Sequence, residues 1–253
     1  MRKKILIKIA YDGSNYNGWQ RQPDIDAIEN IVEKACKELF KEDVKIMGAS
    51  RTDKGVHAKC QLATFEANVR NYKISNIARA ITSKLPDDII VYESVEVNSD
   101  FHVRYNRSLK TYIYTINNAK INMPMYRKHS MYVENDLCLE NMKLAAKEFL
   151  GTYDFKAFCA VKSSNKDTIR TITNINLKKH EDFITLTITG NGFLHNMVRI
   201  ITGTLIDVGK GKKKPEDIKG IIESLDRKKA GPTAKAEGLL LYNIEIEGDY
   251  IGK

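Results

Sequence analysis

The sequence has 253 residues, and its 41 lysines and arginines against 32 aspartates and glutamates give a formal net charge of +9. Hydrophobic residues make up 42% of the chain, enough to bury a core, which excludes disordered, collagen-like and coiled-coil proteins. No apolar run approaches the roughly 20 residues that span a bilayer, and the charged start of the chain predicts a strand instead of a signal peptide. We therefore expect a cytoplasmic protein of one large domain or two closely packed ones, with an anionic partner and no membrane contact.

The cysteines and the basic clusters narrow the class further. The four cysteines lie far apart with no C-x-x-C pair, so the sequence predicts neither a zinc site nor a disulfide framework. The surplus charge alone is as consistent with solubility as with nucleic-acid binding. Its basic clusters, however, lie mostly in segments rich in Gly, Asn or Pro, which is typical of loops that border a groove. These clusters are at 2–4, 104–110, 210–214 and 227–229.

The first half of the chain predicts an alternation of strands and helices. Alternating apolar residues over 4–10 indicate a strand with its isoleucines on one face. Pro23 and apolar residues at helical spacing predict a helix over 24–40. Strands are expected at 44–47 and 61–65, on either side of a polar loop at 48–59. A short helix at 75–85, which Pro86 closes, and a strand at 89–97 follow.

The second half repeats this order loosely. We expect a strand at 110–116, a helix at 137–150 that ends at Gly151, and strands at 170–178 and 183–189. A helix at 193–208, a second beginning at Pro215 and a last strand at 239–246 complete the chain. The prediction is an α+β protein of two pseudo-symmetric halves, 1–106 with the polar loop and 107–253, packed as one unit around a shared sheet. A cleft between the halves is the expected place for a site.

The polar loop holds the densest set of chemically useful side chains. Arg51 and Lys54 close to Asp53 would keep that carboxylate ionised, which suits a nucleophile or a general base. An ordinary hairpin loop whose aspartate caps a turn is the alternative. A third interpretation is a divalent metal shared by Asp53 and His57 with a further carboxylate, either Asp12 or Asp24, as in a metal-dependent nuclease or phosphatase.

Aromatic and basic residues elsewhere allow two interpretations each. Trp19, with Tyr16 and Arg21 nearby in the segment 11–23, fits base stacking and phosphate contact, and it also fits a loop held by one buried tryptophan; these two interpretations are compatible. Tyr112 and Tyr114 share one face of a predicted strand, and such a stripe is more often core than substrate platform.

An arginine interrupts the apolar helix predicted at 193–208. Arg199 lies among apolar neighbours there, so we expect it to pair with a carboxylate. The partner would be Asp207, Asp217 or a carboxylate inside the cleft.

Six motifs, in order along the chain, resemble the tRNA pseudouridine synthase I (TruA) family. They are Y-D-G-S-N-Y-N-G-W-Q-R-Q-P at 11–23, G-A-S-R-T-D-K-G-V-H-A at 48–58, F-H-V-R at 101–104, K-T-Y at 110–112, G-N-G-F-L-H-N-M-V-R-I-I-T-G at 190–203 and A-E-G-L-L-L at 236–241. The resemblance extends from about residue 5 to about residue 246. The chain departs from the family pattern at Ser50, where Gly is usual, at Lys54, where Ala is usual, and at 27–29, where T-V-Q is commoner than A-I-E.

The resemblance implies the pseudouridine synthase fold, a mostly antiparallel sheet flanked by helices, and an isomerase that converts uridine to pseudouridine. It implies Asp53 as the catalytic nucleophile, Arg199 as its ion-pair partner, and Tyr112 and Arg51 as substrate-binding residues. One of the leucines at 239–241 would line the uracil pocket. The implied partner is tRNA, modified at positions 38, 39 and 40 of its anticodon stem-loop, and the implied protein is a homodimer without metal or other cofactor.

Two alternatives concern the RNA and the chemistry. The same isomerisation on a different RNA target fits every motif, because no residue named here reads a base sequence. A non-catalytic RNA-binding protein fits the charge pattern alone. Within the isomerase interpretation, attack on C1′, addition to the base and removal of a ribose proton all require the same ionised aspartate.

Overall fold

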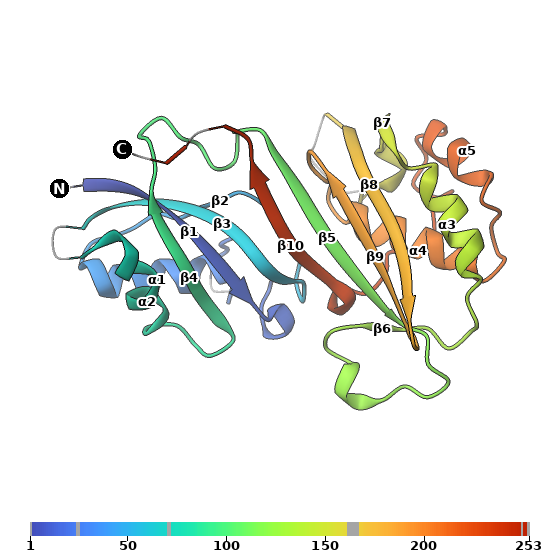
Figure 1. Ribbon diagram of the computed structural model, residues 1–253, viewed down its shortest axis with the longest axis horizontal. Helices are drawn as coiled ribbons and strands as arrows, with labels where there is room; N and C mark the ends of the chain where they lie inside the picture. The colour runs from blue at the N-terminus through green and yellow to red at the C-terminus, as the bar shows by residue number, and fades with distance from the viewer. Residues whose placement is uncertain (1, 24–25, 70–71, 161–166, 249, 252–253) are drawn as a thin grey trace. The chain divides into compact units, whose positions relative to one another are not determined.

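The computed structural model describes residues 2–23, 26–69, 72–160, 167–248 and 250–251. The described chain is mixed α+β, with ten strands that pair mostly antiparallel and five α-helices (Figure 1). The predicted α+β class is therefore confirmed. The chain divides into two compact units, Met1–Ser108 with Leu241–Lys253, and Leu109–Leu240. No helix in the described residues is long and apolar enough to cross a bilayer.

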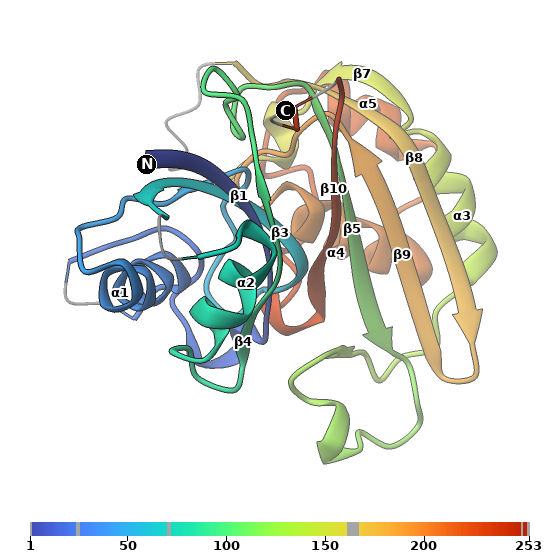
Figure 2. The same ribbon diagram turned by 60° about the vertical axis from the view of Figure 1, so that its left-hand side comes forward.

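The first unit is built on the strand order β4-β1-β3-β10. These strands are β4 (Ile89–Glu96), β1 (Arg2–Tyr11), β3 (His57–Asn68) and β10 (Leu239–Ile246), and the short β2 (Met47–Gly48) pairs with β3. Helices α1 (Ile28–Phe40) and α2 (Ile74–Thr82) lie together on one side of these strands (Figure 2). The alternation predicted for β1 places Ile5, Ile7 and Ile9 in the core, where each is 0% exposed.

The second unit is built on the strand order β5-β9-β8-β7. These strands are β5 (Ser108–Asn117), β9 (Phe183–Gly190), β8 (Ile169–His180) and β7 (Gly151–Asp154). The short β6 (Met131–Tyr132) pairs with β5 in the parallel sense. Helix α4 (Met197–Gly209) is almost entirely buried, and α3 (Leu139–Lys147) packs against it, with α5 (Asp217–Glu223) nearby (Figure 1). Four short 3-10 helices complete the described elements: η1 (Gly13–Asn15), η2 (Pro124–Tyr126), η3 (Lys156–Phe158) and η4 (Ala236–Gly238).

Several predicted boundaries differ from the observed ones for local reasons. Helix α1 begins at Ile28 and not at 24, because Ala27 is extended (φ −111°, ψ 149°), while 24 and 25 lie outside the described residues. Helix α4 begins at Met197 and not at 193, because Asn196 adopts a left-handed conformation (φ 62°). The strand predicted at 44–47 is reduced to β2, and β3 already begins at His57, so the polar loop shortens to 49–56.

The C-terminal strand, β10, makes the observed division into units differ from the predicted division at residue 106. Its bounds, Leu239–Ile246, match the prediction. It lies beside β3, however, so residues from Leu241 onward are part of the first unit, although they follow the whole second unit in sequence. A division in chain order at residue 106 does not capture this return, because sequence periodicity identifies a strand without naming its neighbour.

Candidate active site

The candidate catalytic residue, Asp53, lies in the loop 49–56 that connects β2 to β3. The loop is closed by Ala49 N–H, which donates to Leu62 O at 2.8 Å, and by Val56 N–H, which donates to Asp53 O at 3.1 Å. Asp53 is half-buried, whereas Arg51 and Lys54 are exposed. Neither cation forms a hydrogen bond or ion pair through its side chain within the described part of the chain. Neither cation forms an ion pair with Asp53 in the described residues, their effect on its ionisation stays a prediction, and both are exposed to an anionic ligand.

The loop is supported by the first sequence motif, residues 11–23. Trp19 N–H donates to Thr52 O at 3.1 Å, and the Tyr11 hydroxyl lies 2.7 Å from Thr52 Oγ1. Two glycines allow this close approach. A Cβ at Gly13 would lie 2.0 Å from Val56 O, and one at Gly18 would lie 2.4 Å from Thr52 O. Two motifs that are about thirty residues apart thus form one packed structure around Asp53.

Trp19 is the buried pin of this structure and not a base-stacking residue. It is 1% exposed, and a Cβ at Gly48 would lie 2.4 Å from its Nε1 atom. Tyr16 is also buried, at 8% exposure, and its hydroxyl donates to the Asp88 carboxylate. Burial, together with this bond, raises the pKa of Tyr16. Trp19 and Tyr16 are therefore packed inside the protein, where they help to hold the loop.

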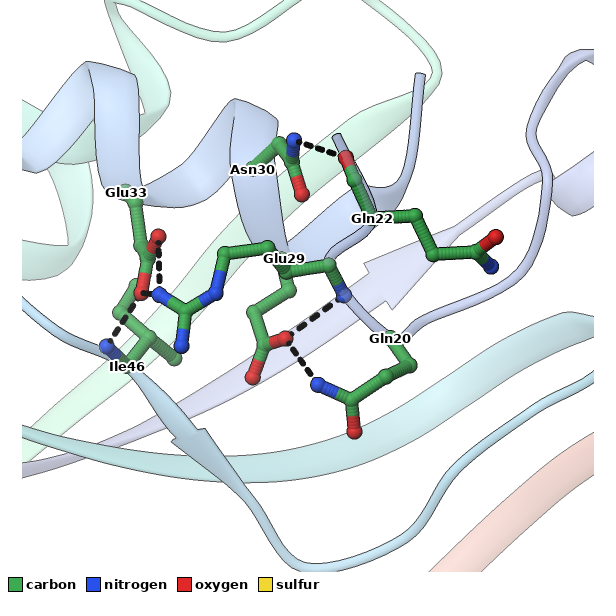
Figure 3. A network of polar contacts seen from close by, with 7 residues as sticks. Gln20, Gln22, Glu29, Asn30, Glu33 and Ile46 are labelled. Atoms are coloured by element: carbon green, nitrogen blue, oxygen red, sulfur yellow. Dashed lines mark hydrogen bonds and ion pairs between the residues drawn. The ribbon is translucent and has the colours of Figure 1, made fainter. Parts of the chain in front are cut away.

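The basic residue of the same motif, Arg21, is also engaged within the protein, in a network that includes Gln20, Glu29 and Glu33 (Figure 3). Its guanidinium donates to both carboxylate oxygens of Glu33, at 2.6 and 2.8 Å. Glu29, which is 4% exposed, accepts from Gln20 Nε2 at 2.8 Å and from Arg21 N–H at 2.7 Å. Burial raises the pKa of Glu29. This network fixes the segment that leads from Trp19 into α1.

His57 is engaged in the same local structure. Its Nδ1 accepts from Gly13 N–H at 3.1 Å and lies 3.1 Å from Asp12 Oδ1. Asp12 Oδ1 in turn accepts from Ser14 N–H at 2.9 Å. Asp12 and His57, two of the residues named for a metal site, thus use Oδ1 and Nδ1 for contacts within the turn that packs against the Asp53 loop. Asp24, the other carboxylate named for a metal site, lies outside the described residues.

In the second unit, the two tyrosines of β5 are buried. Tyr114 is 0% exposed, and its hydroxyl donates to Lys235 O at 2.6 Å, so it is a core residue. Tyr112 is 6% exposed, and its ring meets Phe193 edge-on at a centroid distance of 5.2 Å. Among the three leucines of the last motif, Leu239 and Leu241 are buried, and only Leu240 is partly exposed.

Arg199, on α4, is oriented by groups of the second unit. Its Nε donates to Ala234 O at 2.8 Å, and its Nη1 donates to Asn196 Oδ1 at 2.8 Å. Ala234 N–H returns a bond to Arg199 O at 3.0 Å. The structure therefore brings Arg199 together with the segment that precedes the A-E-G-L-L-L motif. Its pairing with Asp53, which belongs to the first unit, stays a prediction.

Two supporting residues were not predicted from the sequence. Gln61 is 0% exposed, and its Nε2 donates to Ser50 O at 2.6 Å, which anchors the Asp53 loop. Asn196 is the acceptor for Arg199 and adopts the left-handed conformation. A lone glutamine inside an apolar strand pattern is the only signal that identifies the first. Asparagine's tolerance of positive φ is the corresponding signal for the second.

Comparison with known proteins identifies the class. A family described as tRNA pseudouridine synthase matches residues 7–106 and 145–246. A tRNA pseudouridine synthase A from Thermoanaerobacter sp. (strain X514) is 44% identical over 242 residues, which cover 96% of this chain and 99% of the relative. A tRNA pseudouridine synthase A 2 from Clostridium perfringens (strain 13 / Type A) is 46% identical with the same coverage. A tRNA pseudouridine synthase A from Acetivibrio thermocellus is 44% identical, again covering 96% and 99%.

These matches extend over nearly the whole chain and over both units. The chain belongs to the tRNA pseudouridine synthase family. The resemblance inferred from the six motifs is thereby confirmed.

Proposed function

We propose that this chain converts uridine to pseudouridine in the anticodon stem-loop of tRNA, at positions 38, 39 and 40. The names of its relatives supply the reaction and the RNA class. The observation that carries the proposal is the Asp53 loop, in which two sequence motifs hold a half-buried carboxylate beside the exposed Arg51 and Lys54. The net charge of +9 supports an RNA substrate, because a polyanion binds cations on the protein.

Asp53 is the proposed nucleophile. Cleavage of the N1–C1′ bond of uridine develops positive charge at C1′, and an ionised carboxylate stabilises or traps that charge. The detached uracil turns, its C5 bonds to C1′, the hydrogen on C5 leaves as a proton, and N1 gains a proton. Atoms and electrons balance in this sequence without an external oxidant or reductant, and the proposal includes no metal or other cofactor.

Three other residues complete the proposed site. Arg199 pairs with Asp53 and keeps it ionised, which its hydrogen bonds to Asn196 and Ala234 support by fixing the guanidinium. Tyr112 stacks on the uracil while the base turns. Arg51, exposed and without a partner in the described residues, assists displacement of the target nucleotide. Unstacking a base costs a few kcal/mol, which phosphate contacts from arginine and lysine offset.

The remaining parts of the proposal follow from the family and its substrate. We expect a homodimer that works in the cytoplasm, where tRNA is modified. Sedimentation velocity of the purified chain tests the first expectation, because a monomer at micromolar concentration contradicts it.

Tritium release tests the reaction. RNA labelled at uridine C5 loses its label when C5 bonds to carbon, so the wild-type chain should release tritium from a tRNA transcript, and Asp53→Asn should release essentially none. Asp43→Asn, which changes an exposed aspartate of the same unit, is the matched control and should remain active. Full release by Asp53→Asn would show that Asp53 is not the nucleophile.

The target positions need a separate experiment. Pseudouridine mapping in tRNA and rRNA from cells with and without this chain should lose signal at positions 38, 39 and 40 of tRNA. Loss at other uridines would establish the same chemistry on another RNA. Salt-sensitive RNA binding without any modified nucleoside would instead identify a non-catalytic RNA-binding protein.

A further inference from the structure

The connection that follows β4 contains a rigid turn at 101–107. Phe101 and Val103 anchor it, with exposures of 4% and 1%, and Phe101 stacks against Tyr250 at a centroid distance of 5.2 Å. The backbone N–H groups of Tyr105 and Asn106 donate to His102 O at 3.0 and 2.9 Å. His102 N–H donates to Asn106 Oδ1 at 3.0 Å. These bonds fix the conformation of the turn before any ligand binds.

The turn presents an aromatic ring to solvent. Tyr105 is 77% exposed, more than any other large apolar side chain in the described residues. One face of its ring is held by the His102 ring, at a centroid distance of 4.2 Å and an interplanar angle of 33°. A ring that is fixed by a neighbour and open on its outer side loses little conformational entropy when a second ring system stacks on it.

Two arginines flank this ring. Arg104 and Arg107 are both exposed. Within the described part of the chain, neither guanidinium forms a hydrogen bond or an ion pair within 4.0 Å. Arg2 and Arg21, by contrast, are paired with Glu42 and Glu33. The two arginines next to Tyr105 are therefore exposed cations beside an exposed aromatic ring, the combination with which proteins bind single-stranded nucleic acids.

A cavity of about 400 Å³ is lined in part by Phe101 and His102 of the turn. Its charges are mixed, because Arg2, Lys4 and Lys45 are accompanied by Asp43 and Glu66. A polyanion is better matched by the exposed residues Arg104, Tyr105 and Arg107, which do not line this cavity.

The turn lies near the Asp53 loop within the first unit. Arg104 is close enough to Glu29 for its charge to favour the ionised form of that carboxylate. Glu29 N–H donates to Trp19 O at 3.0 Å, and Trp19 N–H donates to Thr52 O at 3.1 Å, next to Asp53. A nucleotide bound at the turn and a uridine bound at the loop would thus contact the same unit of the protein.

We propose that the turn 101–107 is an RNA-binding site, in which Tyr105 stacks on an unpaired base close to the isomerised uridine while Arg104 and Arg107 bind the adjacent phosphates. This inference rests on the proposed function, since it takes the RNA at the Asp53 loop as its starting point. It assigns the turn a binding role and no part in bond cleavage.

Binding of an anticodon stem-loop RNA to the full chain tests the stacking contact. Tyr105→Ala should raise the Kd roughly tenfold or more, whereas Tyr105→Phe, which keeps the ring, should bind as the wild type does. Tyr92→Ala, which removes an exposed tyrosine of β4, is the control and should leave the Kd unchanged. An unchanged Kd in Tyr105→Ala, or a loss in Tyr105→Phe equal to that in Tyr105→Ala, would overturn the proposal.

Salt titration tests the phosphate contacts. Replacing Arg104 and Arg107 together by glutamine should lower the slope of log Kd against log salt by about 1 to 2, the value for two lost contacts. Arg79→Gln, an exposed arginine of α2, should leave the slope unchanged. A slope equal to that of the wild type in the double variant would overturn the assignment of these two arginines.

A series of RNAs identifies the stacked base and separates this inference from the proposed function. In stem-loops that carry one abasic nucleotide beside the target uridine, the effect of Tyr105→Ala should vanish at one position, and an effect that persists at every position contradicts stacking. Tritium release by the wild type is measured in parallel. Release with no dependence of binding on Tyr105 rejects the turn alone, whereas Tyr105-dependent binding without release supports the turn and rejects the isomerase.

Discussion

Gly18 is the position at which one added methyl group should separate folding from activity. Its φ is +88°, and a Cβ there would lie 2.4 Å from Thr52 O and 3.0 Å from the carbonyl carbon of Asp53. Ordinary contacts begin near 3.4 Å, so the backbone of the Asp53 loop must move by about 1 Å to admit an alanine. A displacement of about 1 Å at a reacting group costs on the order of a hundredfold in rate.

The same substitution also carries a conformational cost. Alanine in the left-handed region costs about 1–2 kcal/mol, and overpacking adds about 1–3 kcal/mol. Gly211 supplies the control, because its φ is +72° and nothing lies within 4 Å of an added Cβ. Gly211→Ala should therefore lose only the first contribution, and the difference between the two variants isolates the contact with the loop.

Two assays distinguish these effects. Urea denaturation measures the free energy of unfolding, and single-turnover tritium release at saturating RNA measures the chemical step. We expect Gly211→Ala to react at the wild-type rate and Gly18→Ala to react about a hundredfold more slowly, at a temperature at which both remain folded. A folded Gly18→Ala protein with the wild-type rate would show that the segment 11–23 does not position Asp53.

Three further substitutions test how the candidate site is held. Asn196→Gly keeps the left-handed backbone but removes the acceptor for Arg199, so single-turnover activity should fall about tenfold or more. Asn196→Asp retains an acceptor and should keep most of the wild-type activity. Wild-type activity in both variants would contradict this role of Asn196. Gln61→Met loses the hydrogen bond to Ser50 O, and urea denaturation should show that the free energy of unfolding falls by about 1 kcal/mol. The loss is no larger because the substitution also removes Gln61 Oε1, which is buried without a partner. For Glu29, burial raises the pKa above 4.5, so ionisation destabilises the fold as pH rises through the range between its unfolded and folded pKa values. Glu29→Gln should therefore match the wild-type Tm at low pH and exceed it near neutral pH, and a constant difference across pH would contradict the assignment.

The elements with clear periodicity were predictable from the sequence. The last strand was predicted with its observed bounds, Leu239–Ile246, because its apolar residues lie between two Glu-Gly pairs, at 237–238 and 247–248. The starts of α1 and α4 were not, since Ala27 is not a typical N-cap residue and Asn196 caps α4 from a left-handed conformation. The neighbour of the last strand was also beyond sequence reasoning, because strand order depends on contacts between residues about 180 positions apart.

The candidate site divides in the same way. A dense polar loop between two predicted strands identified Asp53 and its neighbours, because a cluster of polar residues between glycines can be recognised in the sequence itself. Whether Trp19 faces RNA or the core was not visible, because the answer depends on Gly48, whose missing side chain leaves room for the indole. The role of Tyr114 as a core residue also depends on a residue distant in sequence, because its hydroxyl donates to the carbonyl of Lys235.

The two single-residue departures from the family pattern in the Asp53 loop have a structural explanation. Ser50 stands where Gly is usual, but its φ is not positive, so the backbone does not require Gly there, and its carbonyl accepts from Gln61 Nε2. Lys54 stands where Ala is usual, and it is exposed, while Gly55 provides the left-handed residue of the turn at φ +78°. The Lys54 side chain forms no hydrogen bond or ion pair within the described residues, so it does not hold Asp53. Lys54 instead adds a cation to the solvent-facing side of the loop, so its replacement by alanine should weaken RNA binding in proportion to one phosphate contact and leave the stability of the fold unchanged.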